Sequence, residues 1–497
     1  MPLGDARPYA QGVTTAPEGV ATSLDGRQFR FRSPVGTPFV PGGFVTLRDG
    51  ASVDATSRGG DAASGSTGGS TGGEQLGQVD DLDFDGDDTL AGTGKLLGER
   101  RPDGSLDTGS THPFAWASVD TADDDAVELI FRAAKATLDI GSLIGVADVR
   151  ARLLAHRFNR HTFWCGQSGS GKTYALGVLL EQLLVDTALP MVIFDPNGDF
   201  VRLRELRTAV DTDDERELAR KDIRVLRPGD AENPLLARFI DFPMRSKAAV
   251  LRLDPIDDRA EYNALVHLDV KTEAQRPEGI VPALLASNDP AAEELGRRIE
   301  NLRLIDWDVW AEGRDAVTDV LDERPDATVL DLGGFAYPDE HLVIALAVLD
   351  DLWAKRESRR PLLIVIDEAH NLCSPDDDRP LQRAVRERII QIAAEGRKFG
   401  LWLLLSTQRP SKVHPNIISQ CDNLALMRMS SPLDLEELGT IFGFAPPSLL
   451  AHAPGFRQGE ALLAGGFVPA PMLVKVRDRL TEEGGADVRV PLRSPAR

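Results

Sequence analysis

The chain is poor in cysteine, and its cysteines follow no pattern. Only Cys165, Cys373 and Cys421 occur among 497 residues, and none belongs to a Cys-x-x-Cys pair. A disulfide framework or a zinc site is therefore not expected, and a reducing compartment fits this composition.

Long apolar runs are also missing. The longest, such as Leu401–Leu405, are far shorter than the roughly 20 residues that cross a bilayer. The first residues, Met1–Pro8, lack the apolar core of a signal peptide. We therefore expect a cytoplasmic protein without a membrane partner.

Positive charge is the third shortage. The chain has 56 Lys and Arg against 78 Asp and Glu, for a formal net charge of −22. A protein that coats nucleic acid needs many cations to neutralise phosphates, so this class is excluded. A single local basic surface remains compatible with the composition. The length allows two or three domains.

The first 120 residues predict a small β domain. Short stretches with alternating polar and apolar residues, typical of strands, occur at Gln28–Arg32, Gly43–Leu47 and around Thr89–Val119. Residues 57–88 interrupt this pattern and are predicted to be a disordered insertion, because they combine a Gly/Ser/Thr-rich stretch with an acidic run.

The acidic run, Asp80–Asp88, invites comparison with a calcium-binding EF-hand loop. The closing Glu of such a loop is absent, since Gly92 and Thr93 stand in its place, and no helical pattern flanks the run. A solvated acidic tether is the favoured interpretation.

Residues 121–478 alternate apolar strands with longer helices. This order is typical of an α/β fold with a mostly parallel sheet covered on both faces. Residues 205–320 are charged and largely helical in pattern, which predicts an insertion, and residues 479–497 are predicted to be a tail. The expected strands are 159–165, 191–195, 328–332, 362–367 and 401–407, and the expected helices 172–185, 341–356 and 381–398.

The segment Gly166–Thr173 fits the pattern GxxxxGK[ST] at every fixed position. Its glycines let the backbone curl so that several N–H groups point at phosphate oxygens. Lys172 is predicted to reach the β and γ phosphates of ATP, and Thr173 to ligate Mg²⁺. An ordinary Gly-rich turn is the alternative, which the preceding apolar strand and following helix disfavour. The predicted nucleotide-binding residues are Gly166, Gln167, Ser168, Gly169, Ser170, Gly171, Lys172, Thr173 and Tyr174.

A second apolar strand, Leu362–Ile366, ends in two carboxylates. Asp367 is predicted to hold Mg²⁺, and Glu368 to polarise the water that attacks the γ-phosphate. A carboxylate at this place is more typical of a hydrolase than of a passive nucleotide switch. The alternative is a pair of acids that cap the strand end.

A third buried strand ends at Gln408, which we predict to sense the nucleotide or to orient water. The alternative is an amide that bonds to the backbone of its own loop.

Taken together, these motifs resemble the HerA-type ATPases of the HerA/FtsK group, whose core is RecA-like and whose N-terminus carries a small β-barrel. The resemblance covers about residues 140–478, and the Gly/Ser-rich and acidic insertion departs from it. The motifs that carry it are Asn159–His161, Asp195–Phe200, Ile366–Asn371, Glu395–Gly400, Ser406–Ser411 and Ser419–Asn423.

The resemblance implies a hexameric ring with ATP and Mg²⁺ bound between subunits. A catalytic arginine would reach across from the neighbour. Arg397 matches the family's Gly-Arg-Lys motif and is the first candidate; Arg160 is the second. A structural role is the alternative for each. The C-terminal segment Gly459–Val476 is expected to lie over a nucleotide site.

Basic residues gather between Arg379 and Arg428, where only Glu387, Glu395 and Asp422 oppose them. In a ring, this basic island is predicted to line the pore and contact DNA phosphates. The alternative is that some of these arginines serve ATP or subunit contacts. The basic residues are Arg379, Arg383, Arg386, Arg388, Arg397, Lys398, Arg409, Lys412 and Arg428.

The leading hypothesis is therefore an ATP-driven DNA translocase or helicase that works with a nuclease or effector in end processing or defence against foreign DNA. No nuclease constellation is found in the chain itself. The alternatives are a secretion or conjugation ATPase and an ATP-dependent assembly protein. The DNA form, the direction of movement and the partner stay undetermined by sequence.

Overall fold

The computed structural model describes residues 19–49, 73–146, 149–268 and 277–485. The chain divides into two compact units, Met1–Ala134 with Gly145–Val149, and Lys135–Ile144 with Arg150–Arg497. The N-terminal unit thus extends past the predicted boundary at residue 120. It gains helix α1 (Asp124–Ala134), whose apolar face, including Val127 and Phe131, is buried.

The N-terminal unit is a closed β-barrel, as predicted. Its strands follow the order β2-β1-β7-β3-β4-β5-β6, and β5 pairs back with β2. Apolar residues at every second position, such as Phe29 and Phe31, fill the interior, while Arg30 and Arg32 face outward. The strands are β1 (Gly19–Ser23), β2 (Gln28–Pro34), β3 (Phe44–Asp49), β4 (Glu74–Phe84), β5 (Thr89–Arg100), β6 (Leu106–Asp107) and β7 (Phe114–Thr121).

The acidic run corrects the prediction of disorder. Residues 74–84 form strand β4, and residues 85–88 turn into β5. The run is ordered because its acids alternate with apolar residues and because basic residues of neighbouring strands face it: Lys95 lies 3.5 Å from Asp80, and Arg32 lies 2.7 Å from Asp85. This hairpin has no EF-hand helices. The Gly/Ser-rich stretch before residue 73 lies outside the described residues.

The second unit contains the predicted, mostly parallel sheet. Its strand order is β12-β13-β11-β14-β15-β10-β16-β17-β18-β8-β9. The strands from β12 to β16 are parallel to one another, and the remaining four join antiparallel. They are β8 (Leu138–Leu143), β9 (Arg150–Leu153), β10 (His161–Cys165), β11 (Met191–Asp195), β12 (Ile223–Leu226), β13 (Ala327–Asp331), β14 (Leu362–Ile366), β15 (Leu401–Thr407), β16 (Cys421–Met427), β17 (Glu460–Gly465) and β18 (Met472–Val476).

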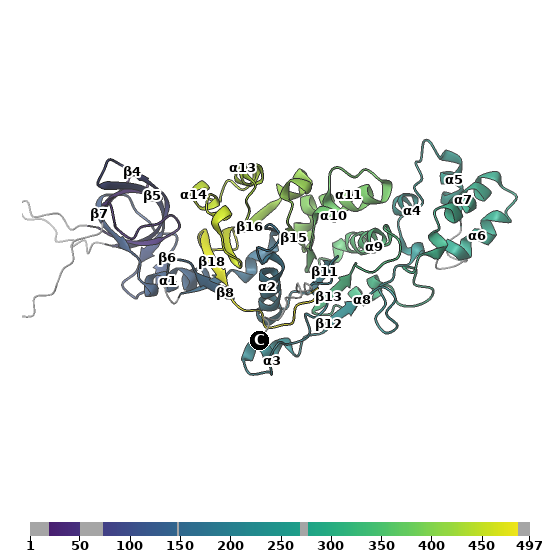
Figure 1. The fold of residues 1–497 in the computed structure, drawn as a ribbon, viewed down its shortest axis with the longest axis horizontal. Helices are drawn as coiled ribbons and strands as arrows, with labels where there is room; N and C mark the ends of the chain where they lie inside the picture. The colour runs from purple at the N-terminus through teal and green to yellow at the C-terminus, as the bar shows by residue number, and fades with distance from the viewer. Residues whose placement is uncertain (1–18, 50–72, 147–148, 269–276, 486–497) are drawn as a thin grey trace, which may run out of the picture. The chain divides into compact units, whose positions relative to one another are not determined.

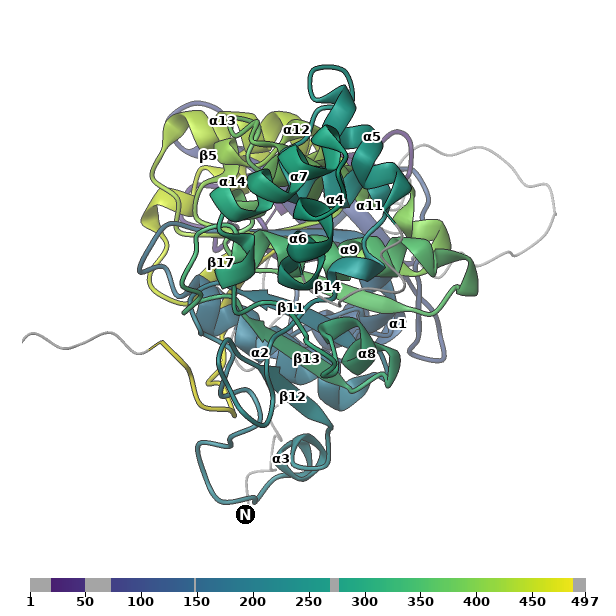
Figure 2. The same ribbon diagram turned by 90° about the vertical axis from the view of Figure 1, so that its right-hand side faces the viewer.

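Helices cover both faces of this sheet (Figures 1 and 2). From β10 the chain crosses through α2 (Lys172–Asp186) to β11 in one direction along the sheet. The connections through α9 (Glu340–Ala354) and α11 (Pro380–Glu395) run in the opposite direction. Because such crossovers are right-handed, α9 and α11 lie on the face opposite α2. The central strands are buried on both sides, which explains their uninterrupted apolar sequences.

The predicted helical insertion, residues 205–320, is only partly helical. Its first part contains β12, a short strand that pairs with β13 at the sheet edge and that the surrounding charge had concealed. Most of the rest is helical, and α5, α6 and α7 lie together beyond α4 (Figure 1). The helices are α3 (Asp213–Leu218), α4 (Met244–Val250), α5 (Arg259–His267), α6 (Pro277–Leu285), α7 (Pro290–Asn301) and α8 (Val317–Asp322).

The prediction of a tail from residue 479 is wrong for its described part. Arg479 is buried, and its guanidinium lies 3.5 Å from the Glu181 carboxylate on α2. The backbone N–H groups of Leu480 and Thr481 donate to the same carboxylate. Residues 477–485, which we call the strap, are therefore part of the ATPase unit. Nowhere in the described chain does a helix combine the length and apolarity needed to cross a bilayer.

Candidate active site

The phosphate loop joins the end of β10 to the start of α2, as the motif predicts. Gly169 and Gly171 have φ values of 72° and 89°, a left-handed region that other residues rarely adopt. Gly171 caps α2, so the helix N-terminus points its free N–H groups at the loop. The loop is also tied to a neighbouring strand, since the Gly166 N–H donates to the carbonyl of Thr407 at 3.3 Å.

Lys172 lies at the centre of the site. Its ammonium is 2.9 Å from Asp367 Oδ1, 2.8 Å from Ser406 Oγ and 3.4 Å from Glu368 Oε1. Burial lowers the pKa of Lys172, but the two carboxylates outweigh burial and hold the pKa above its ordinary value. The lysine is therefore charged in this site and can bind phosphate oxygens.

Glu368 is held in an unusual conformation. Its φ is 44°, in the left-handed region, which costs on the order of 1–3 kcal/mol for a residue with a side chain. Burial raises the pKa of Glu368, but the His370 contact and the Lys172 charge lower it below its ordinary value overall. The carboxylate is thus ionised at neutral pH and able to accept a hydrogen bond from water.

A cluster of carboxylates fits a magnesium ion. One oxygen from each of Asp195, Asp199 and Asp367 lies within 4.8 Å of the others. Asp367 Oδ2 is buried and has no hydrogen-bond partner among the described residues. Burial raises the pKa of Asp195 to about 7 and of Asp199 to about 6, a cost that a bound cation would offset. Because Mg²⁺ prefers oxygen ligands, this cluster together with Thr173 suits it.

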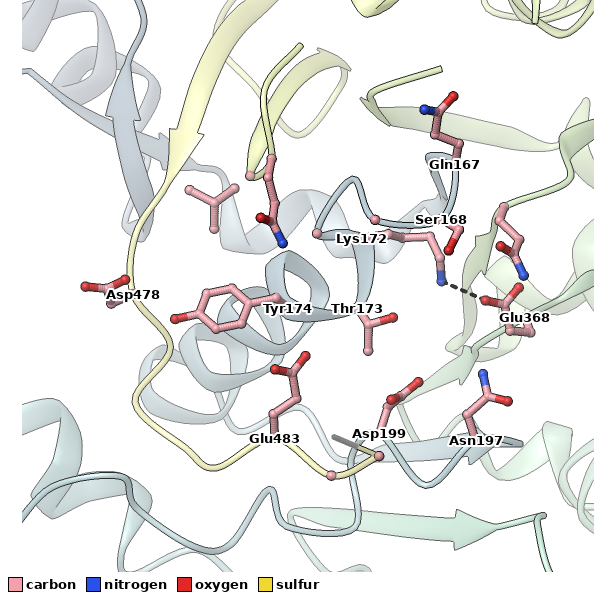
Figure 3. Close-up of a pocket in the computed structure, with 18 of the residues that line it drawn as sticks. Gln167, Ser168, Lys172, Thr173, Tyr174, Asn197, Asp199, Glu368, Asp478 and Glu483 are labelled. Atoms are coloured by element: carbon pink, nitrogen blue, oxygen red, sulfur yellow. Dashed lines mark ion pairs between the residues drawn. The ribbon is translucent and has the colours of Figure 1, made fainter. Parts of the chain in front are cut away.

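The three acids differ in how available they are. Both Asp195 oxygens already accept backbone N–H groups, from Asp199 at 2.9 Å and Phe200 at 2.8 Å. Asp199 instead lines the cavity beside Thr173 (Figure 3). Asp199 and Asp367 are therefore the better metal ligands. The sequence carried a signal for Asp199 that we did not use, namely a second carboxylate four residues after the strand-end acid.

A cavity of about 710 Å³ opens over the phosphate loop (Figure 3). Its volume is within the usual range for nucleotide-sized ligands. Of the predicted nucleotide-binding residues, Gly166 and Ser170 are buried and do not line it. The seven that do are Gln167, Ser168, Gly169, Gly171, Lys172, Thr173 and Tyr174.

The far wall of the cavity comes from the end of the described chain. Gln458, Gly459, Lys475 and Val476 line it, as expected for the segment Gly459–Val476. The strap extends this wall, and its residues Asp478 and Glu483 also line the cavity (Figure 3). Within the strap, the Arg479 N–H donates to the Tyr174 hydroxyl at 2.8 Å, which ties it to α2.

The end of β15 supplies more of the site than predicted. Gln408 lines the cavity, as expected. Ser406 accepts a hydrogen bond from Lys172, and the Thr407 hydroxyl lies 3.2 Å from His370 Nδ1. Sequence reasoning missed both hydroxyls, because Ser and Thr at a strand end carry no specific signal.

Arg160 and Arg397 are brought together, but away from their own phosphate loop. Arg397 Nη1 lies 2.6 Å from Asp422 Oδ2, and Arg160 Nε lies 3.6 Å from the same oxygen. Arg160 precedes β10, whereas the phosphate loop follows it. At about 3.3 Å per residue, the five residues of β10 separate the two by roughly 16 Å.

The basic island is largely neutralised, which corrects the expectation of an unopposed positive surface. Acids outside the island pair with most of it: Asp339 and Asp377 with Arg379, Asp378 with Arg383 and Arg386, Asp350 with Arg388, and Asp376 with Lys412. Arg397 pairs with Asp422, and Arg428 donates to the carbonyl of Gly169. Among the described residues, no carboxylate partner is found for Lys398 or Arg409.

Comparison with known proteins finds related helicases. Residues 138–350 match the family model described as "Helicase HerA, central domain". A probable helicase of Methanocaldococcus jannaschii is 23% identical over 445 residues, covering 84% of this chain and 82% of that protein. A DNA double-strand break repair helicase HerA of Sulfurisphaera tokodaii is 24% identical over 401 residues, 75% of each chain.

Solved structures give more distant matches. VirB4 of Thermoanaerobacter pseudethanolicus is 15% identical with a TM-score of 0.46, over 69% of this chain and 96% of that one. The bacterial conjugative coupling protein TrwB, lacking its first 70 residues, is 14% identical with a TM-score of 0.44, over 72% and 92%. The family match and the curated relatives confirm the resemblance that the motifs indicated. This chain is therefore a P-loop ATPase that is similar to HerA helicases and whose residues 138–350 match their central domain.

Proposed function

We propose that this chain is an ATP-hydrolysing ring motor that translocates on DNA or unwinds it. The observation that carries the proposal is the cluster of Lys172, Asp367 and Glu368 beneath a nucleotide-sized cavity. Relatives named as HerA repair helicases support the choice of DNA as the substrate.

The residues of the site divide the work of hydrolysis. Lys172 neutralises the negative charge of the γ-phosphate, and Glu368 accepts a hydrogen bond from the attacking water and polarises it. Mg²⁺, held by Thr173, Asp367 and Asp199, would supply charge neutralisation at the phosphates. Gln408, on the cavity wall, is placed to orient the water or to register the presence of the γ-phosphate.

A second subunit is needed to complete the site. Lys172 is the only cation contacting the catalytic carboxylates among the described residues, and Arg160 and Arg397 lie at the other end of β10. In a ring, that end of one subunit can face the nucleotide of the next, so either arginine would stabilise the transition state in trans. We propose a hexamer, after the family, with Arg397 as the first candidate.

Fewer basic residues are proposed to contact DNA than the sequence predicted. Arg409 and Lys398 are exposed and have no carboxylate partner in the described chain. Arg409 follows β15 directly after Gln408, so a phosphate bound there would lie two residues from the buried end of the strand. A nuclease or effector partner, in end processing or in defence against foreign DNA, completes the proposal.

Steady-state ATP hydrolysis by the full chain, with Mg²⁺ and with or without duplex or single-stranded DNA, tests the proposal. We expect DNA to raise kcat, and Lys172→Ala to abolish hydrolysis. If neither form of DNA binds or changes turnover, the motor proposal fails. ATP-dependent oligomerisation without DNA affinity would instead favour an assembly protein, and co-purification with membrane components a secretion or conjugation ATPase.

A further inference from the structure

A short polar chain connects the end of β15 to the catalytic carboxylate. His370 Nδ1 lies 3.2 Å from Glu368 Oε2 and 3.2 Å from Thr407 Oγ1. The Thr407 hydroxyl also accepts the backbone N–H of Arg409 at 3.0 Å. His370 therefore stands between Glu368 and the first exposed residue after the strand.

The chemistry of the three groups fixes the proton on the histidine ring. Glu368 in its proposed role is a carboxylate, which can only accept hydrogen bonds. The contact is attractive only if Nδ1 carries the proton. Nδ1 lies 3.2 Å from both Glu368 Oε2 and Thr407 Oγ1, so the direction of the Glu368 side chain depends on where Thr407 and His370 lie.

Thr407 is also joined to the nucleotide-binding loop. Its carbonyl accepts the Gly166 N–H at 3.3 Å, and the preceding residue, Ser406, accepts a hydrogen bond from Lys172. Thr407 thus contacts the phosphate loop through its backbone and, through its side chain, the histidine that lies against the catalytic glutamate. The left-handed φ of Glu368 adds strain to this arrangement, so a small shift of Thr407 can release or redirect the carboxylate.

We propose that His370 is a positioning residue that couples the segment after β15, Gln408–Lys412, to Glu368. In this proposal, which rests on the proposed function, DNA bound at Arg409 regulates hydrolysis through these contacts. DNA that moves Arg409 pulls on the Thr407 hydroxyl through the Arg409 N–H, and His370 transmits that movement to the catalytic carboxylate. The coupling runs through the His370–Glu368 contact, the His370–Thr407 contact and the Arg409–Thr407 hydrogen bond.

The test compares two substitutions that remove the chain with two that keep it. His370→Ala and Thr407→Val remove the ring N–H and the hydroxyl. His370→Asn leaves an amide N–H close to the position of Nδ1, and Thr407→Ser keeps the hydroxyl. ATP affinity, kcat without DNA and the ratio of DNA-stimulated to basal kcat are measured for each variant and for the double variant of His370→Ala and Thr407→Val.

We expect either removal to lower kcat about 10–100-fold at unchanged ATP affinity, because a misplaced carboxylate costs rate rather than binding. The DNA stimulation is lost in both, and the Asn and Ser variants keep most of it. The double variant falls no further than the single ones, since both break one chain. Two matched controls keep wild-type kinetics: Thr328→Val, at a buried strand threonine whose hydroxyl has no partner among the described residues, and His452→Ala on the surface.

The inference is overturned by wild-type kcat and stimulation in His370→Ala and Thr407→Val, or by a loss of ATP binding that accounts for the lower rate. Additive effects in the double variant would also contradict it. A different result would contradict the proposed function and not this inference. If DNA does not stimulate the wild-type chain, the proposal that DNA regulates hydrolysis is wrong. Basal kcat in the four variants still decides whether His370 positions Glu368.

Discussion

The two ends of the parallel strands in the ATPase unit differ in how exposed their charged side chains are. At the carboxyl end, the side chains of Lys172, Asp367 and Glu368 are 7%, 0% and 10% exposed, and the Lys172 ammonium lies within 3.4 Å of both carboxylates. At the amino end, Arg160 and Arg397 are 40% and 34% exposed and share one half-exposed carboxylate, Asp422.

This difference indicates which end is preorganised within one subunit. Buried charges in tight contact are held in place and keep their geometry without a partner, whereas half-exposed arginines exchange readily between an internal acid and an external anion. The carboxyl end is therefore a preorganised binding site for nucleotide. The amino end is a source of cations for another molecule, which we propose to be the next subunit's ATP.

The largest effect on kcat is expected from removing the catalytic carboxylate at the carboxyl end of the strands. Glu368→Gln keeps the shape of the side chain but cannot polarise water, so we expect kcat to fall by about 10³-fold. ATP binding should persist, because Lys172 and the loop are unchanged. Stopped-time hydrolysis assays and equilibrium ATP binding measure the two quantities. Residual turnover near the wild-type rate would show that another group activates the water.

Removing an arginine at the amino end of the strands should lower kcat less. Arg397→Ala removes one of two cations, and the loss of a single stabilising donor costs about 10²-fold in kcat. ATP affinity should change little. Arg383→Ala, which removes an exposed arginine paired with Asp378, is the matched control and should retain full activity. An unchanged kcat in both Arg397→Ala and Arg160→Ala would make these arginines structural.

His161, at the amino end of the strands, predicts a pH dependence of the free energy of unfolding. It is fully buried at the amino end, with Nε2 donating to the Ala393 carbonyl at 3.0 Å and Nδ1 accepting the Leu403 N–H at 2.9 Å. Burial, with a smaller contribution from Arg397, lowers the pKa of His161 from 6.5 to about 4. The imidazole is therefore neutral in the folded chain.

Because the unfolded chain takes up this proton at higher pH than the folded one, the stability from a neutral His161 is full above pH 6.5 and falls as the pH drops towards 4. Between pH 7 and pH 5 we expect a loss of about 2 kcal/mol in the free energy of unfolding. Denaturant unfolding of wild type and His161→Gln at both pH values measures it. The expectation fails if both proteins lose the same stability.

The smallest effect is expected at the strap. A Cβ added at Gly177 on α2 would lie 2.6 Å from the buried guanidinium carbon of Arg479. We expect Gly177→Ala to lower stability by about 1 kcal/mol, although Gly→Ala in a helix normally raises it. Gly439→Ala in α13 (Pro432–Ile441), where the nearest atom is 3.4 Å away, is the matched control. Thermal unfolding of the two variants should shift in opposite directions.

Much of the carboxyl end was predictable because its signals are local. The phosphate loop and Asp367-Glu368 directly follow apolar strands, and the carboxyl ends of neighbouring parallel strands meet at one edge. Gln408 follows a third strand in the same way. The strand β12 was missed because four residues in a charged region give too short a pattern to separate from helix.

The contacts made by tertiary folding were not predictable. His370 and Thr407 are 37 residues apart and meet only because β14 and β15 are neighbours. The neutralisation of the basic island was also not predicted, because its partners, such as Asp339 and Asp350, lie outside the segment between Arg379 and Arg428. Arg479, read as part of a tail, is fixed by Glu181 on a helix almost 300 residues earlier.

Complementation between two inactive variants tests most directly the claim that the two ends meet across subunits. Glu368→Gln and Arg397→Ala subunits are mixed in equal amounts before ATP and DNA are added. In random mixed rings, about a quarter of the interfaces combine an intact Glu368 with an intact neighbouring Arg397, so we expect hydrolysis to recover to about a quarter of the wild-type rate. A mixture that hydrolyses ATP no faster than the average of the two variants alone would contradict the account.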